Sequence, residues 1–126
     1  MAALVFDAGA LIAIERGDRE VAAILVAAAK SSTEAITSST CVAQVWRGPA
    51  RQARLARALA GFVERDLDAR GARDCGTLLA RSETTDIADA AVSLLARDGD
   101  TLLTSDPEDI KRLLDATGTR ARIRSV

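Results

Sequence analysis

The chain has 126 residues, which suits one domain that buries roughly two-thirds of the surface its unfolded form exposes. Its 17 basic and 18 acidic side chains give a formal net charge of -1, so bulk charge does not draw it to nucleic acid or to an anionic membrane. The chain has no histidine and only two cysteines, Cys41 and Cys75. This excludes the usual zinc ligand sets and most histidine acid-base catalysis, and it favours two buried thiols over a disulfide.

No basic segment precedes the first apolar run, so the chain does not begin like a secretory signal. The longest apolar run, Val21 to Ala29, is too short to span a bilayer. We therefore expect a soluble, cytoplasmic protein with a single domain over residues 1–126.

Apolar segments typical of strands alternate with helical patterns along the chain, which predicts an α/β fold with a parallel sheet. In the first half we expect a strand at Leu4–Phe6, helices at Ala10–Ile14 and Arg19–Ala29, a strand at Ala35–Thr37, and a helix that begins at Thr40, breaks at Gly48-Pro49 and resumes to about Ala60. In the second half we expect a strand at Phe62–Glu64, a helix at Asp68–Ala80, a helix from Thr85 or Asp86 to Arg97, a strand at Thr101–Thr104, a helix at Pro107–Ala116 and an edge strand at Ala121–Val126.

Two of these strands end in an aspartate at a turn into a helix. Asp7 follows the first strand and Asp106 the fourth, and the carboxyl ends of parallel strands can be neighbours at one edge of a sheet. Asp86 and Asp89 are three residues apart at the start of a helix, so they share one face. Carboxylates that converge without a balancing Lys or Arg bind hard divalent cations such as Mg²⁺ or Mn²⁺. Such ions activate water for displacement at phosphorus, so phosphodiester hydrolysis is the leading chemistry.

Each of these acids also has a structural interpretation. Asp86 and Asp106 can cap the helices that follow them, and Asp109 can complement the dipole of the last helix. For these three acids capping and function both stay open. Asp7 favours function, because a serine would cap the helix without bringing a charge to the sheet edge.

The segments LVFDAGALIAIERGD, CVAQVWRG and DAAVSLLARDGDTLLTSDPEDI occur in this order along nearly the whole chain. Together they resemble the PIN-domain ribonucleases, in particular the VapC toxins of VapBC toxin-antitoxin modules. The resemblance implies an α/β/α sandwich with a parallel sheet of about five strands, an acidic Mg²⁺ or Mn²⁺ site and endonucleolytic cleavage of RNA. It also implies a homodimer and a cognate antitoxin that masks the site. Asp7, Asp89 and Asp106 match the acids of the family. Asp86 and Asp109 match accessory acids.

The chain departs from this family at Gln44, where a glutamate is usual. The amide oxygen of Gln44 can still ligate a cation or hold a metal-bound water as part of the catalytic set, but it supplies no charge and cannot act as a base. We expect Asp86, one turn before Asp89, to restore the missing negative charge. The rival interpretation is a non-catalytic PIN-like domain that binds RNA or an antitoxin and whose site Gln44 weakens.

Local basic charge supports an RNA substrate. No acid occurs between Glu34 and Glu64, yet four arginines recur at intervals of four, three and three residues. Helical geometry would place them on one stripe, which could contact the phosphates of RNA. Two other interpretations of the stripe stay equally open: a face exposed to solvent, and a surface that binds an acidic partner. The four arginines are Arg47, Arg51, Arg54 and Arg57. The chain has only three aromatic residues, so few side chains can stack on bases. We expect RNA recognition to rely on the phosphates and on RNA shape.

Three arginines, Arg120, Arg122 and Arg124, alternate along the last strand, where protection of a sheet edge by charge is favoured over RNA contact. Residues 22–29 are apolar nearly all round. Such a helix is buried on both sides or forms part of an interface, and we favour core burial. If an antitoxin binds, we expect it to lay an amphipathic helix in an adjacent groove.

Two other families that place acids at strand ends fit less well. A haloacid-dehalogenase-like phosphatase needs a second aspartate two positions after Asp7, where this chain has Gly9. A receiver domain needs a lysine at the end of a late strand, and the only lysines, Lys30 and Lys111, lie in helical stretches.

Overall fold

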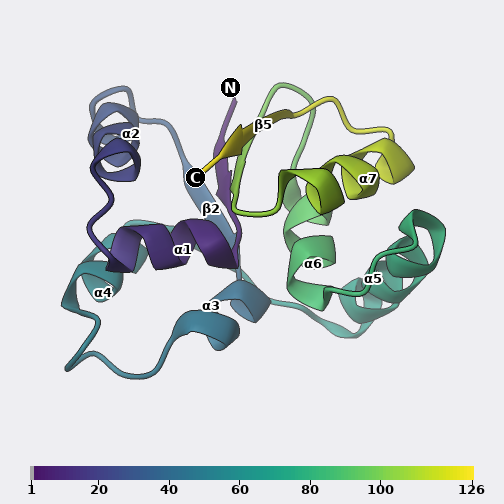
Figure 1. The fold of residues 1–126 in the computed structure, drawn as a ribbon, viewed down its shortest axis with the longest axis horizontal. Coiled ribbons are helices and arrows are strands. Elements are labelled where there is room, and N and C mark those ends of the chain that lie inside the picture. Colours follow the sequence, from purple (N-terminus) through teal and green to yellow (C-terminus); the bar gives the residue numbers. More distant parts are fainter. Residues whose placement is uncertain (1) are drawn as a thin grey trace.

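A computed structural model describes residues 2–126 and shows a five-stranded sheet between two groups of helices (Figure 1). The strands are β1 (Leu4–Phe6), β2 (Ala35–Ser38), β3 (Val63–Arg65), β4 (Thr101–Thr104) and β5 (Arg122–Ser125). Their order across the sheet is β3-β2-β1-β4-β5, and every neighbouring pair is parallel. The predicted α/β fold with a parallel sheet is therefore confirmed, and the expected edge strand at the end of the chain is β5.

The helices form a layer on each side of the sheet (Figure 1). On one side lie α1 (Ala8–Glu15), α2 (Arg19–Lys30) and α4 (Ala53–Leu59); on the other lie α5 (Ala69–Ser82), α6 (Ile87–Leu95) and α7 (Pro107–Thr117). The short helix α3 (Ser39–Val45) packs against both α1 and α6. It thus connects the two layers next to the carboxyl end of β2.

The central strands are the most buried part of the molecule. Val5, Phe6, Leu102 and Leu103 have no exposed surface, as expected for strands that are covered on both faces. Both cysteines are free and buried, as predicted. Burial, and secondly the charge of Asp7, raises the pKa of the Cys41 thiol to about 12, so this thiol stays protonated and unreactive.

The start of α3 differs from the expectation. Ser38 caps this helix, because its hydroxyl accepts a hydrogen bond from the backbone N–H of Thr40 at 3.2 Å. Thr40 was expected to cap but lies in the first turn instead. Serine and threonine cap helices about equally well, and Ser38, the last residue of β2, caps α3 because this helix follows the strand without a loop.

The predicted arginine stripe is wrong. The helix α3 ends at Val45 because Trp46 is already extended, and α4 begins only at Ala53, after a loop in which Gly48 adopts φ +137°. Arg47 and Arg51 lie in the intervening loop. Only Arg54 and Arg57 share a helix.

The buried side chain of Gln52 makes hydrogen bonds to the backbone of this loop. Its side-chain oxygen accepts hydrogen bonds from the backbone N–H groups of Arg47 at 2.7 Å and Gly48 at 3.3 Å. Its amide nitrogen donates to the carbonyl of Val45 at 2.8 Å and to the carboxylate of Glu15 at 2.6 Å. Gln52 is only 4% exposed, so a buried amide with all of these bonds holds the loop between α3 and α4 to the end of α1.

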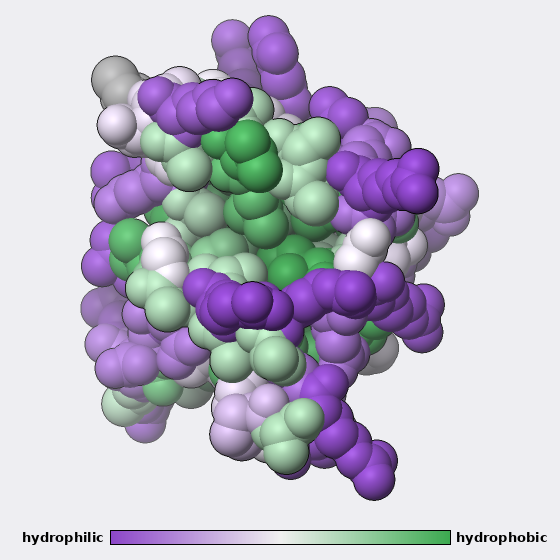
Figure 2. Space-filling model, turned by 90° about the vertical axis from the view of Figure 1, so that its left-hand side faces the viewer, coloured by the Kyte–Doolittle hydropathy of each residue, from purple (hydrophilic) through white to green (hydrophobic). Residues whose placement is uncertain are grey.

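Core burial of residues 22–29 on both sides is also wrong. Ala28 is buried, but Val26 is 56% exposed on the outer face of α2. Figure 2 views the molecule from the side where α2 and α4 lie, and it shows hydrophobic surface gathered in a hollow with hydrophilic side chains around it. Among the described helices, none combines the length and apolar character that a membrane crossing needs.

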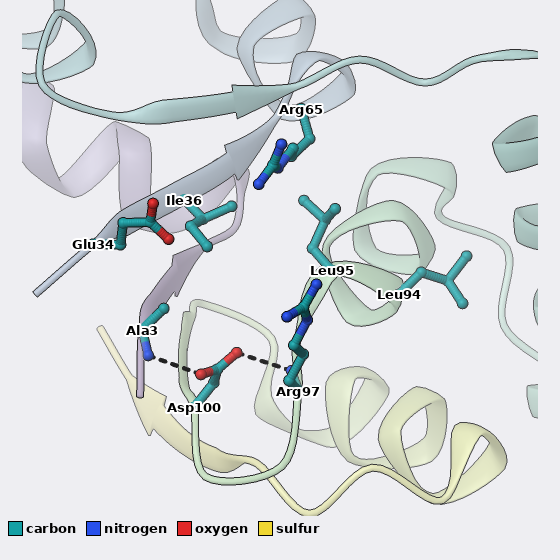
Figure 3. A pocket seen from close by; sticks show the side chains of 8 residues that line it. All are labelled: Ala3, Glu34, Ile36, Arg65, Leu94, Leu95, Arg97 and Asp100. Carbon is teal, nitrogen blue, oxygen red and sulfur yellow. Dashed lines mark hydrogen bonds between the residues drawn. The ribbon is translucent and has the colours of Figure 1, made fainter. Parts of the chain in front are cut away.

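The turn before β4 is held by Asp100. Its carboxylate, 5% exposed, accepts hydrogen bonds from the backbone N–H of Arg97 at 2.9 Å and of Ala3 at 2.8 Å (Figure 3). The helix α6 therefore ends at Leu95, two residues earlier than expected. The bond to Ala3 ties this turn to the start of β1, at the amino edge of the sheet.

Candidate metal centre

The strand order reverses between β1 and β4, and both strands are followed by an aspartate. Ligands bind to open parallel sheets outside the carboxyl ends of the strands at such a reversal point. Phe6 of β1 is the register partner of Leu103 of β4, so Asp7 and Asp106 follow the two strands at the same edge. The structure thus places two acids that are about a hundred residues apart in the chain at the same edge of the sheet.

Asp7 is buried and held in one orientation. It is 2% exposed, and its carboxylate caps α1 by accepting a hydrogen bond from the backbone N–H of Ala10 at 2.8 Å. Burial raises the pKa of the Asp7 carboxyl, while a hydrogen bond from the Thr104 hydroxyl and bonds from backbone N–H groups lower it. An anion kept in this place by donors on one side is well suited to bind a cation on the other.

Three further carboxylates converge at this edge. One oxygen each from Asp89, Asp106 and Asp109 lies within 4.8 Å of the other two. This three-carboxylate group contains two of the four predicted metal ligands; Asp7 and Asp86 are not part of it, and Asp109 is. Burial raises the pKa of the Asp89 carboxyl to about 7, and the charges of Asp86, Asp7, Asp106 and Asp109 act in the same direction. Oxygen ligands in excess of nearby positive charge fit Mg²⁺ or Mn²⁺, which take carboxylates and water.

Thr104 links two of the acids. Its hydroxyl accepts a hydrogen bond from the backbone N–H of Asp106 at 2.8 Å and, from the other side, lowers the pKa of the Asp7 carboxyl. Thr104 has no exposed surface. Sequence analysis assigned Thr104 only to the strand and missed this role, although the Thr-Ser-Asp turn was the available signal.

Capping and metal ligation are compatible at the helix starts. Asp86 caps α6 by accepting from the backbone N–H of Asp89 at 2.9 Å, and Asp106 caps α7 by accepting from Asp109 at 3.4 Å. In each case one carboxylate oxygen makes the bond, so the other can serve a cation. The structural interpretation of these two acids is correct, and it leaves the functional one open.

Gln44 lies next to Asp86 and outside the three-carboxylate group. It is exposed on α3 and lines a hollow of about 310 Å³ together with Asp86. Of the predicted acids only Asp86 lines this hollow with Gln44, and the expected catalytic role of Gln44 stays a prediction.

Gly9 has a packing role at the site. A Cβ at this position would collide with the side chain of Ser105, so only glycine allows the first turn of α1 to approach the turn after β4. The two elements that carry Asp7 and Asp106 are therefore in direct contact.

Comparisons of the sequence alone find nothing: no protein-family profile and no curated protein matches it. Comparison of the structure does find a match. The VapBC2 complex from Rickettsia felis, bound to a DNA fragment from its promoter, contains a chain with a TM-score of 0.69 and 16% sequence identity, over 98% of this chain and 98% of that chain. This chain has the fold of a VapBC component. The match spans the full domain and includes the edge that carries the acids.

In this VapBC-like fold the four arginines of the predicted RNA surface fall into two places. All are exposed. Arg54 and Arg57 line a groove between α2 and α4 that contains none of the clustered acids. Arg47 and Arg51 lie in the loop after α3, and the guanidinium of Arg47 donates to the carbonyl of Trp46 at 2.7 Å. A role of any of them in RNA binding stays a prediction.

Proposed function

We propose that the protein is a metal-dependent endoribonuclease, the toxin of a type II toxin-antitoxin system that acts in the cytoplasm. Asp7, Asp89 and Asp106 would hold Mg²⁺ or Mn²⁺, with Asp86 and Asp109 as accessory acids. The observation that carries this proposal is the convergence of carboxylates that make no ion pair within residues 2–126, at the reversal point of a VapBC-like sheet.

When bound, the cation would supply an activated water and stabilise charge on the phosphate oxygens. The residues of the chain prepare this chemistry. The backbone N–H of Ala10 fixes the orientation of Asp7, and the Thr104 hydroxyl lowers the pKa of its carboxyl. In the metal-free protein burial raises the pKa of Asp89 to about 7, and a bound cation would hold this carboxyl in the anionic form that ligates it.

A cleavage assay tests this proposal. The wild-type protein, incubated with structured RNA and Mn²⁺, should cut it, and Asp7→Asn or Asp106→Asn should lower the rate by more than about 100-fold, because loss of a ligand exceeds the effect of loss of an outer-shell partner. Asparagine caps helices as well as aspartate does, so both variants should keep the thermal stability of the wild type. Wild-type activity that survives either change would refute the assignment.

Gln44 supports a second candidate function, a PIN-like domain that binds RNA or an antitoxin without cutting. The discriminating variant is Gln44→Glu, which returns the carboxylate usual in the family. RNA left intact by the wild type under varied metals, with cutting gained only in Gln44→Glu, would establish the binding function.

We also propose that a cognate antitoxin binds the apolar groove between α2 and α4. The apolar lining of the groove is Ile14, Ala22, Leu25, Val26 and Ala58. Two basic residues, Arg54 and Arg57, and one acid, Asp18, lie beside them. It belongs to the hollow face of Figure 2. An amphipathic helix with acidic residues along one side suits this combination of apolar floor and basic rim.

Co-purification with the product of a neighbouring reading frame tests this surface. Val26→Asp should abolish the complex, whereas Val126→Asp, a matched change of an exposed apolar residue outside the groove, should leave it intact. Equal recovery of the complex with both variants would contradict the assignment. The homodimer that the family resemblance implies is part of the same proposal, and light scattering of the purified chain measures it.

A further inference from the structure

A hollow beside Asp86 is lined mostly by residues that have no part in the proposed metal site. It lies between α3 and the start of α6 and has a volume of about 310 Å³. Six residues line it: Thr40, Gln44, Thr85, Asp86, Ile87 and Ala88. Only Asp86 among them is a carboxylate, so most of the lining consists of hydroxyls, one amide and apolar groups.

One wall presents neutral hydrogen-bonding groups. Thr40 and Gln44 are four residues apart on α3, so they share a face of the helix. Gln44 is exposed, and its amide can donate and accept a hydrogen bond side by side. This pairing of donor and acceptor matches the edge of a nucleobase, and a glutamine amide pairs in two places with adenine.

The opposite wall presents an apolar side chain to solvent. Ile87, the first residue of α6, is 56% exposed although it directly follows Asp86 and comes two residues before Asp89. A single exposed apolar residue is ordinary on a protein surface. An apolar surface that faces a few polar groups across a hollow is instead the usual composition of a ligand pocket.

We propose that this hollow is a nucleobase subsite, in which Gln44 reads the hydrogen-bonding edge of an adenine next to the scissile phosphodiester and Ile87 packs against the base. The inference rests on the proposed ribonuclease function and adds a sequence preference to it. It also explains why position 44 carries an amide. A carboxylate there would only accept hydrogen bonds, and beside Asp86 it would add negative charge that repels RNA. Recognition then includes one base, beyond the phosphates and RNA shape expected from the sequence.

Binding to short RNAs separates this inference from catalysis. In the Asp7→Asn background, which the proposed function makes inactive, four single-stranded RNAs that differ only in one central base are compared by fluorescence anisotropy. The adenine RNA should bind about tenfold more tightly than the uracil RNA, the size expected for one paired amide. Gln44→Leu should reduce this ratio to nearly one, and Ile87→Ser should weaken all four RNAs alike.

Leu94→Ser is the matched control, because Leu94 is also exposed on α6 but lies two turns from the hollow. It should change neither the affinity nor the preference. The inference is overturned if no base preference exists, if Gln44→Leu keeps it, or if no RNA binds. It is also overturned if light scattering shows that Ile87→Ser dissociates a dimer, since the side chain then contacts a second copy. A base preference in a wild-type protein that cuts no RNA would refute the nuclease and keep the subsite.

Discussion

Asp89 has an environment that few carboxyl groups in a small domain share. It is 9% exposed, and burial together with four neighbouring acids raises its pKa to about 7. The chain has no histidine, the side chain that ordinarily titrates near neutral pH. Its protonation can therefore be observed in the stability of the protein.

In the metal-free protein we expect the free energy of unfolding to fall as the pH rises through 7. The folded pKa lies above the unfolded value of 3.8, so the contribution of Asp89 is complete below about pH 4 and is lost as the pH rises through the folded pKa. Denaturant unfolding in EDTA should show a loss of roughly 2 kcal/mol between pH 5.5 and 7.5. Asp89→Asn should flatten the profile, and a wild-type profile that is already flat would count against the raised pKa.

The roles of single residues were predictable where the neighbouring sequence indicated the strand or helix on which they lie. Asp7 and Asp106 follow strands that can be recognised from local sequence, and the spacing of Asp86 and Asp89 shows their common face. Gln52 was not recognisable, because its role depends on a partner from another segment: its amide donates to the carboxylate of Glu15. No local pattern encodes such contacts.

At the scale of elements, the start of α6 combines capping with charge. Asp86 accepts a hydrogen bond from the backbone N–H of Asp89, and its charge raises the pKa of the Asp89 carboxyl. The two roles are separable, because asparagine caps a helix about as well as aspartate but carries no charge.

Asp86→Asn should therefore keep the stability of the protein and weaken Mn²⁺ binding, whereas Asp86→Ala should lower the free energy of unfolding by about 1 kcal/mol as well. Thermal unfolding and metal titration of the two variants measure these effects. If Asp86→Asn left both Mn²⁺ affinity and cleavage intact, Asp86 would not replace the charge that Gln44 lacks.

The elements themselves were largely predictable, and their junctions were not. The strands and helices were expected near their observed places because hydrophobic periodicity is local. The arginine stripe failed because its spacing continues through the loop at Gly48, whose backbone leaves the helical region. Periodicity of side chains does not report where the backbone turns.

At the scale of the molecule, alternation along the chain predicts a parallel sheet but not the order of its strands. The order β3-β2-β1-β4-β5 makes β1 and β4 neighbours and so places Asp7 and Asp106 at one edge. The exposed face of α2 was equally beyond sequence analysis, because an apolar helix looks the same whether a further layer or a partner covers it. Both features concern packing between distant segments.

The central claim is that the acids at this edge bind a divalent cation. Calorimetric titration with Mn²⁺ at pH 7.5 tests it directly, with Asp106→Asn as the site variant and Asp115→Asn, an exposed acid farther along α7, as the matched control. We expect wild type and Asp115→Asn to bind Mn²⁺ with equal affinity and Asp106→Asn to bind at least about tenfold more weakly. Absence of binding by the wild type, or equal affinity in all three proteins, would contradict the metal site.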